Sequence, residues 1–181
     1  MIHNFLLAQL VGAFGIGCYV WSYQIKKNRK LYIVQAIGCS MFCIQFFMLN
    51  AVTGCISLII LITRNLLLTR YHEWKWVQWR GWIVVFSIFA ILNTWLTWEG
   101  FISLLPCFGL IAGNYGMWSN NARTIRIANA FIVSPLYIVY DIAVGSIAGV
   151  LNELFTISSV LVSIKRFGWK NLGNPDSDFQ K

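Results

Sequence analysis

Seven apolar stretches, each close to the length that crosses a lipid bilayer as a helix, dominate the 181-residue chain. About 20 mostly apolar residues cover the roughly 30 Å of hydrocarbon in a membrane. Charged residues make up only 11% of the chain, against about 25% in ordinary soluble domains. These proportions exclude a soluble enzyme, a disordered chain and a nucleic-acid-binding domain. We therefore predict an all-α polytopic membrane protein with helices over residues 5–23, 31–50, 52–70, 82–98, 101–119, 127–144 and 147–165.

Basic residues are confined to alternate connections between these segments. They follow the first, third, fifth and seventh segments, and the other connections carry no Lys or Arg. Because Lys and Arg are enriched in short cytoplasmic connections, we predict a cytoplasmic C-terminus and an N-terminus on the outer side. Arg64, inside the third segment, is expected to reach the same basic face. The net charge of +8 is therefore a signal of topology in a lipid bilayer, and no nucleic-acid partner is expected.

A weak internal repeat relates the two ends of the chain. At a shift of 97 residues Gly12 aligns with Gly109 and Trp21 with Trp118. The match pairs the first helix with the fifth, and both are predicted to run from outside to inside. It favours two three-helix units in parallel orientation joined by an inverting helix, a 3+1+3 plan used by transporters; chance similarity between apolar helices is the alternative. The predicted units are a first bundle at 1–71, a linker helix within 72–100, a second bundle at 101–166 and a cytoplasmic tail at 167–181, whose polar composition predicts disorder.

The N-terminal third carries a set of short motifs: a Gln-x-x-Gly near the start, a Trp, a basic run, and a Gly before an Arg-Asn pair. The residues are Gln9, Gly12, Trp21, Lys26–Lys30, Gly54, Arg64 and Asn65. The set resembles bacterial inner-membrane proteins of the YgjV type, and the 3+1+3 plan resembles the SWEET and PQ-loop superfamily. The resemblance implies a multi-pass protein of the bacterial inner membrane, with a periplasmic N-terminus, that transports a small molecule. The Pro-Gln dipeptide of PQ-loop proteins is absent, so their substrates are not carried over.

Polar side chains inside the predicted membrane helices are the candidate binding residues. A polar group in hydrocarbon is costly without a partner, so each has a claim to a functional role. Hydrogen bonding between helices is the alternative, because Asn and Gln also join membrane helices. Aromatic rings at helix ends either anchor the helix at the interface or stack on a ligand. The candidates for substrate binding are Gln35, Arg64, Asn65, Asn114, Trp118, Asn129 and Asn152, with Asn93 as a further polar residue of the interior.

Two acidic residues lie in the predicted outer halves of the last two segments. Asp141 is near the outer end of the sixth, and Glu153 is about two turns in from the outer end of the seventh. No basic residue lies on that side, so two neighbouring carboxyl groups would alter each other's titration and one could carry a coupling proton. A facilitator needs no such group, and both mechanisms stay open.

Two prolines lie inside predicted helices. Pro106 falls in the fifth segment and Pro135 in the sixth, where proline removes a backbone hydrogen bond. Prolines within the helices of SWEET-like transporters act as bending points, so the resemblance implies that both are hinges. A static kink is the alternative.

The sequence favours a small-molecule transporter that alternates access between two three-helix halves. An enzyme is not expected, because two His and few membrane acids provide neither a nucleophile cluster nor a metal site, and we predict no metal and no cofactor. A membrane receptor or assembly subunit is the remaining alternative, although short connections leave it little surface for a partner. We expect a small polar metabolite as ligand: amide and aromatic groups suit a sugar, a vitamin or a nucleoside, and Arg64 suits an anion such as a carboxylate. Facilitated or proton-coupled transport, its direction, and homo-oligomer formation are left open.

Overall fold

The computed structural model describes residues 2–24, 28–119 and 122–167, and these residues form helices joined by short connections, with no strand among them. The longer helices are α1 (Ile2–Gln24), α2 (Asn28–Met48), α3 (Val52–Leu68), α4 (Gly81–Leu96), α5 (Leu104–Trp118) and α8 (Ile147–Phe167). Two short 3₁₀ turns, η1 (Lys75–Gln78) and η2 (Phe101–Ser103), lie beside α4 and α5. A further rod runs without a break through α6 (Ala122–Ala128), the π-helical turn η3 (Asn129–Val133) and α7 (Ser134–Val144). Each of the seven predicted segments therefore corresponds to one helical rod.

Three of the rods are long and apolar enough to cross a membrane by length and composition. Their apolar spans are Phe5–Ser22, Phe101–Trp118 and Arg123–Val144. The other four rods are shorter apolar helices, with spans Tyr32–Met48, Val52–Leu68, Gly81–Leu96 and Ile147–Val162. Most predicted boundaries lie within about three residues of the observed ones, and the largest displacement is that of the rod predicted at 127–144, which begins at Ala122. The calls on residues 168–181 lie outside the described residues.

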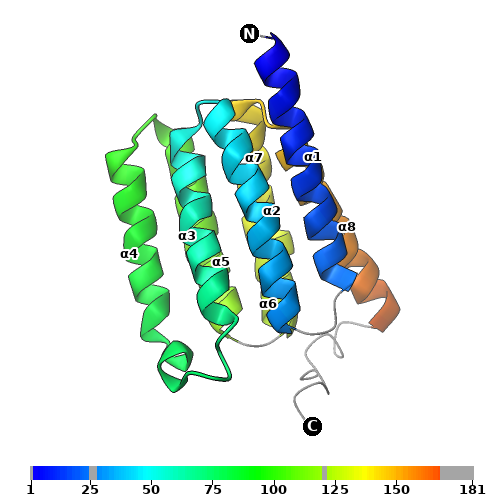
Figure 1. The fold of residues 1–181 in the computed structure, drawn as a ribbon. Coiled ribbons are helices and arrows are strands. Elements are labelled where there is room, and N and C mark those ends of the chain that lie inside the picture. Colours follow the sequence, from blue (N-terminus) through cyan, green and yellow to red (C-terminus); the bar gives the residue numbers. More distant parts are fainter. Residues whose placement is uncertain (1, 25–27, 120–121, 168–181) are drawn as a thin grey trace.

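The rods lie side by side along a common direction and form two facing rows (Figure 1). The first row holds α1, α2 and α3 in chain order, and the second holds α5, the α6–α7 rod and α8. Across the rows, α1 packs against α8 and α3 packs against α5. Helix α4 packs against α3 and α5 at one edge of the two rows. The helices therefore enclose an interior between two rows of three.

Tight turns at one end of the rows set the antiparallel packing of α2 with α3 and of α7 with α8. The α2–α3 turn uses Asn50 at a positive φ of 58°, and the amide of Ala51 donates to the carbonyl of Phe46 at 2.9 Å. Helix α7 ends at Val144, and Gly145, which follows it, has a left-handed φ of 74°. Glycine suits this position because it has no Cβ to clash with the preceding turn.

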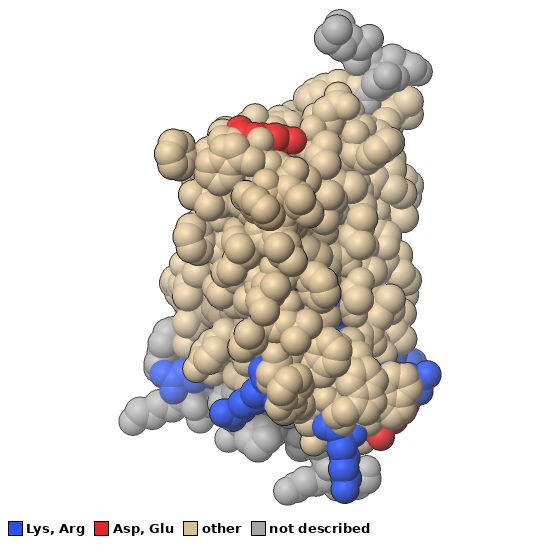
Figure 2. Space-filling model, turned by 90° about the vertical axis from the view of Figure 1, so that its left-hand side faces the viewer, with Lys and Arg blue, Asp and Glu red and all other residues tan. Residues whose placement is uncertain are grey.

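Charged side chains mark the other end of the rows, which we call the basic end. Lys and Arg gather there in Figure 2, and the face shown is almost free of charge between the two ends. Glu73 lies at the basic end, where it accepts a hydrogen bond from Arg29 at 2.9 Å and forms an ion pair with Arg70. Apart from Arg64, which is buried, the predicted one-sided distribution holds for the basic side chains that the structure describes. Those of Lys26, Lys27, Arg166, Lys170 and Lys181 lie outside the described part.

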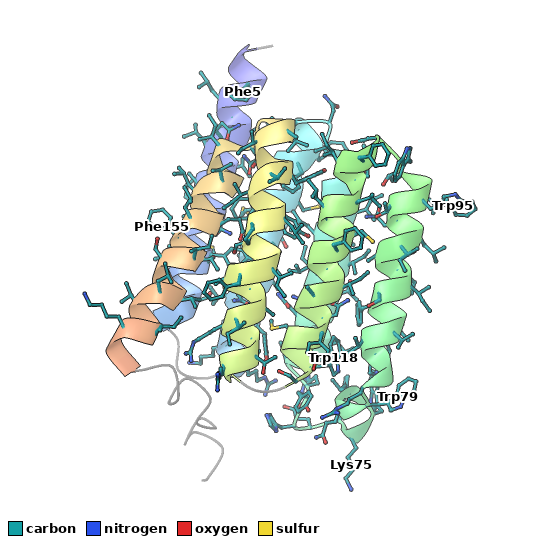
Figure 3. All side chains as sticks on the ribbon, turned by 180° about the vertical axis from the view of Figure 1, so that it is seen from behind. Phe5, Lys75, Trp79, Trp95, Trp118 and Phe155 are labelled. Atoms are coloured by element: carbon teal, nitrogen blue, oxygen red, sulfur yellow. The ribbon has the colours of Figure 1, made fainter. Side chains whose placement is uncertain are left out.

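Large apolar side chains point outward from the helices between the two ends. Trp95 of α4 is 75% exposed, and Phe155 of α8 also projects away from the rows (Figure 3). An exposed apolar belt of this kind is costly in water but favourable in lipid, where backbone polar groups must be satisfied within helices. The belt therefore agrees with the bilayer setting that the sequence predicts.

Candidate functional site

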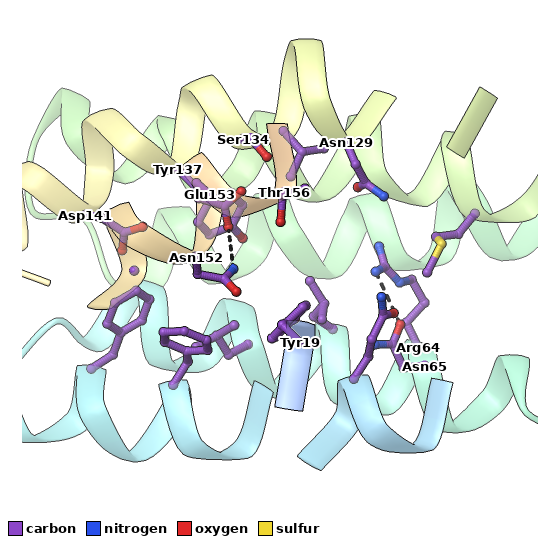
Figure 4. Close-up of a pocket in the computed structure, with 18 residues that line it drawn as sticks. Tyr19, Arg64, Asn65, Asn129, Ser134, Tyr137, Asp141, Asn152, Glu153 and Thr156 are labelled. Carbon is purple, nitrogen blue, oxygen red and sulfur yellow. Dashed lines mark hydrogen bonds between the residues drawn. The ribbon is translucent and has the colours of Figure 1, made fainter. Parts of the chain in front are cut away.

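A cavity lined by both polar and apolar side chains lies between the two rows of helices (Figure 4). It offers about 90 Å³ to the centres of water-sized molecules, which is room for several waters or a small polar solute. It extends along the helices from Asp141 and Gly149, away from the basic end, to Arg64 and Asn65, nearer to it. Both rows contribute polar side chains to its wall.

Most of the residues predicted for substrate binding and proton coupling meet at this cavity. Asn114 does not line the cavity itself, but its Oδ1 accepts a hydrogen bond at 3.1 Å from Nη1 of Arg64, which does. The predicted residues that line the cavity directly are Gln35, Arg64, Asn65, Asn129, Asp141, Asn152 and Glu153. The structure thus brings together side chains that lie more than 100 residues apart in the sequence.

Arg64 has its guanidinium group inside the protein. The residue is only 5% exposed, so the expectation that it reaches the basic face is wrong. Nη1 donates to Asn114 and Nη2 donates to Asn65 Oδ1 at 3.3 Å. A Cβ at Gly113 of α5 would lie 3.2 Å from Nη1, so the absence of a side chain there makes room for the guanidinium group.

Two carboxyl groups face the half of the cavity that lies away from the basic end. Asn152 Nδ2 donates to Glu153 Oε1 at 3.1 Å (Figure 4). Asp141 is 2% exposed and its carboxyl group lies against Gly149, where a Cβ would overlap it. The cation and the two acids therefore occupy opposite parts of one cavity.

The wide π-helical turn η3 forms part of the cavity wall. Its backbone pairs over five residues, as in the hydrogen bond from the amide of Ser134 to the carbonyl of Asn129, and Pro135 follows directly. Such π turns are rare and are frequent at functional sites. Pro135 thus lies just beyond the π-helical turn and directly after Ser134, which lines the cavity.

Sequence reasoning missed several side chains of the wall, among them Ser134, Tyr137 and Thr156. A signal for them was present, because residues three or four apart share one face of a helix. Ser134 and Tyr137 share a face with Asp141 on α7, and Thr156 shares one with Asn152 on α8. A search in steps of three or four positions from each predicted acid or amide would have identified these residues.

Several buried polar atoms around the cavity have no hydrogen-bond partner among the described residues. They are Arg64 Nε, Asn114 Nδ2, Tyr137 Oη and Asp141 Oδ1. Buried polar groups in folded proteins are nearly always paired, with protein or with ordered water. The cavity therefore has the character of a hydrated or ligand-binding space, unlike an apolar void.

Three of the predicted residues lie elsewhere. Trp118 is 2% exposed and its Nε1 donates to the carbonyl of Val77 at 3.0 Å, which fixes η1 beneath the helices. Asn93 donates to Thr53 and Ser57 and joins α4 to α3, as the alternative of interhelical bonding predicts. Pro106 lies in the first turn of α5, where a missing amide proton costs little, so it does not weaken the middle of that helix.

Apolar rods, a belt of exposed apolar side chains and a single basic end define a helical membrane protein, here with an interior cavity whose wall carries polar side chains. The chain belongs to the Imp-YgjV family, described as bacterial inner membrane protein, whose family model matches residues 6–171. The predicted family and its inner-membrane location are thereby confirmed. No curated protein and no solved structure matches the chain significantly.

Proposed function

We propose that this protein is a small-molecule transporter that works by alternating access between two halves, α1–α3 and α5–α8, with α4 as the linker. The observation that carries the proposal is the cavity: it lies between the halves, and both halves supply polar side chains to its wall. Solute sites near the midplane between two repeats are typical of secondary transporters.

The contacts between helices support the predicted 3+1+3 plan. A two-fold axis along the helices would place α1 on α5 and α3 on α8. It would therefore place the contact between α1 and α8 on the contact between α5 and α3. Both contacts exist. In this plan α2 and the α6–α7 rod are equivalent and face each other across the cavity.

Hydrogen bonds between the halves gather at the end opposite the basic residues, and we infer that this end is a closed gate. Gln9 Nε2 donates to the carbonyl of Gly145 at 2.9 Å, and the amide of Ala148 donates to Gln9 Oε1 at 3.2 Å. The amide of Gly54 donates to Tyr140 Oη at 2.8 Å. In the orientation that the basic residues favour, this is the periplasmic gate.

A labelling experiment tests alternating access without knowledge of the solute. Thr156→Cys places a thiol at the cavity, and Phe155→Cys places one on the lipid side of the same helix, in a chain whose five native cysteines are replaced. A transporter predicts that a membrane-impermeant maleimide reaches residue 156 from either side of the membrane and residue 155 from neither. Labelling of residue 156 from one side alone would favour a receptor or assembly subunit.

Uptake assays with reconstituted vesicles then separate proton coupling from facilitated transport, once a thermal-shift screen of sugars, vitamins and organic acids has found a ligand. We propose Glu153, with Asp141 beside the same cavity, as the proton carrier. Glu153→Gln should then remove the response of uptake to an imposed pH gradient, whereas Glu99→Gln, which alters an exposed acid, should keep it. An unchanged response in Glu153→Gln would overturn Glu153 as the proton carrier, and no response in the unaltered protein would indicate a facilitator.

A further inference from the structure

Arg64 carries a buried positive charge that no carboxylate neutralises in the part of the chain that the structure describes. Arg29 and Arg70 instead pair with Glu73, at the basic end and outside the cavity. Transfer of an unpaired charge out of water is expensive, so buried charges are normally paired or bind a ligand. The missing partner of Arg64 is therefore a feature to be explained.

The two hydrogen bonds that Arg64 makes do not supply this partner. They end on the side-chain oxygens of Asn114 and Asn65, which are neutral acceptors. They orient the guanidinium group and leave Arg64 Nε and Asn114 Nδ2 as unpartnered buried donors among the described residues. A guanidinium group binds carboxylates through its N–H donors, so an unused Nε donor on a residue that lines a cavity suits an anion.

We propose that Arg64, oriented by Asn65 and Asn114, is the subsite that binds the carboxylate group of a small organic anion in the cavity. The proposal rests on the proposed transport function in so far as this anion is the transported solute. One uncompensated cation calls for one negative charge. The carboxyl groups of Asp141 and Glu153 in the other half of the cavity (Figure 4) disfavour a ligand that carries more.

Thermal unfolding of the purified protein in detergent tests the subsite, with acetate, lactate, neutral lactamide and inorganic phosphate as probes against chloride at equal ionic strength. We expect acetate or lactate to stabilise the protein saturably and lactamide to have no effect. Arg64→Gln should weaken carboxylate binding by about tenfold or more, since it removes a charge-assisted pair. The matched control is Arg80→Gln, which removes an exposed arginine at the basic end and should leave binding unchanged.

A second variant keeps the test valid if Arg64→Gln fails to fold. Asn114→Asp has nearly the same shape and places a carboxylate where the amide oxygen now accepts from Arg64 Nη1. This internal counter-ion should preserve folding and also weaken carboxylate binding by about tenfold. Undiminished binding in the variants, equal stabilisation by lactamide, a preference for phosphate, or no saturable effect of any carboxylate would overturn the proposal.

The two proposals fail in different ways. Carboxylate binding that depends on Arg64, combined with labelling of residue 156 from one side alone, would retain the subsite and overturn transport. Labelling of residue 156 from both sides, without carboxylate binding, would retain transport and overturn the subsite.

Discussion

The contact between Tyr140 and the start of α3 gives a sharp test of how the two halves are held together. Gly54 is the third residue of α3, and the first amides of a helix have no acceptor within the helix. Tyr140 Oη accepts a hydrogen bond from the amide of Gly54 at 2.8 Å, and Tyr140 is fully buried. The phenol of α7 thus caps α3 across the interface between the halves.

Tyr140→Phe removes the acceptor without adding volume and leaves a buried amide unsatisfied. The expected cost is about 1–3 kcal/mol, and for a chain of this length each kcal/mol lowers the midpoint of thermal unfolding by roughly 2–4 °C. Tyr137→Phe is the matched control one turn away on α7, because Tyr137 is also buried but its hydroxyl has no partner among the described residues. It should leave the midpoint almost unchanged.

The same substitution should also open the gate. If the bond exists only while the end opposite the basic residues is closed, its loss shifts the equilibrium toward the open state by about 5- to 150-fold. Thr156→Cys should then be labelled faster from that side in the Tyr140→Phe background than in the Tyr137→Phe background. Equal midpoints for the two Phe variants would refute the capping argument, and equal labelling rates would refute the gate.

Two further substitutions test the packing and the charges away from this contact. Gly149→Ala should destabilise the protein by about 1–3 kcal/mol in chemical unfolding, because its methyl group would overlap the carboxyl of Asp141; Gly17→Ala, with nothing near the added methyl, should be neutral or stabilising. At the basic end, the hydrogen bond from Arg70 lowers the pKa of Glu73 below its usual value. Because the folded-state pKa is the lower one, the ion pair stabilises the protein above about pH 4.3 and that contribution is lost as the pH falls through the lowered pKa. The stability of Glu73→Gln, measured against pH at low salt, should lack this acid-side loss, and identical profiles would contradict it.

The helical rods could be predicted from the sequence because apolar length is the strongest signal that a membrane chain carries. Their ends were less accurate. Arg123 and Arg126 were assigned to a connection, yet they lie on the helix that continues to Val144. Apolarity marks the part of a helix inside hydrocarbon and cannot mark its extension into water.

The candidate site was predictable in its residue types but not in its geometry. Gln35, Asn129 and Glu153 were chosen because polar groups are costly in hydrocarbon, and all line the cavity. Trp21 and Trp118 align in the repeat, yet the first is 65% exposed and the second 2%. Their environments depend on η1, which packs beneath one of them, and the sequence of the tryptophans themselves does not encode that neighbour.

The wide turn at Asn129–Val133 has a consequence for the phase of the α6–α7 rod. Each residue of an α-helix advances the chain by about 100° around the axis. A π turn acts as one inserted residue, so it rotates everything beyond it by about that angle relative to the helix before it. This rotation directs three side chains beyond the turn into the cavity, those of Ser134, Tyr137 and Asp141. Removing one residue from the turn would restore a regular helix and rotate all three hydrogen-bonding groups out of the cavity together.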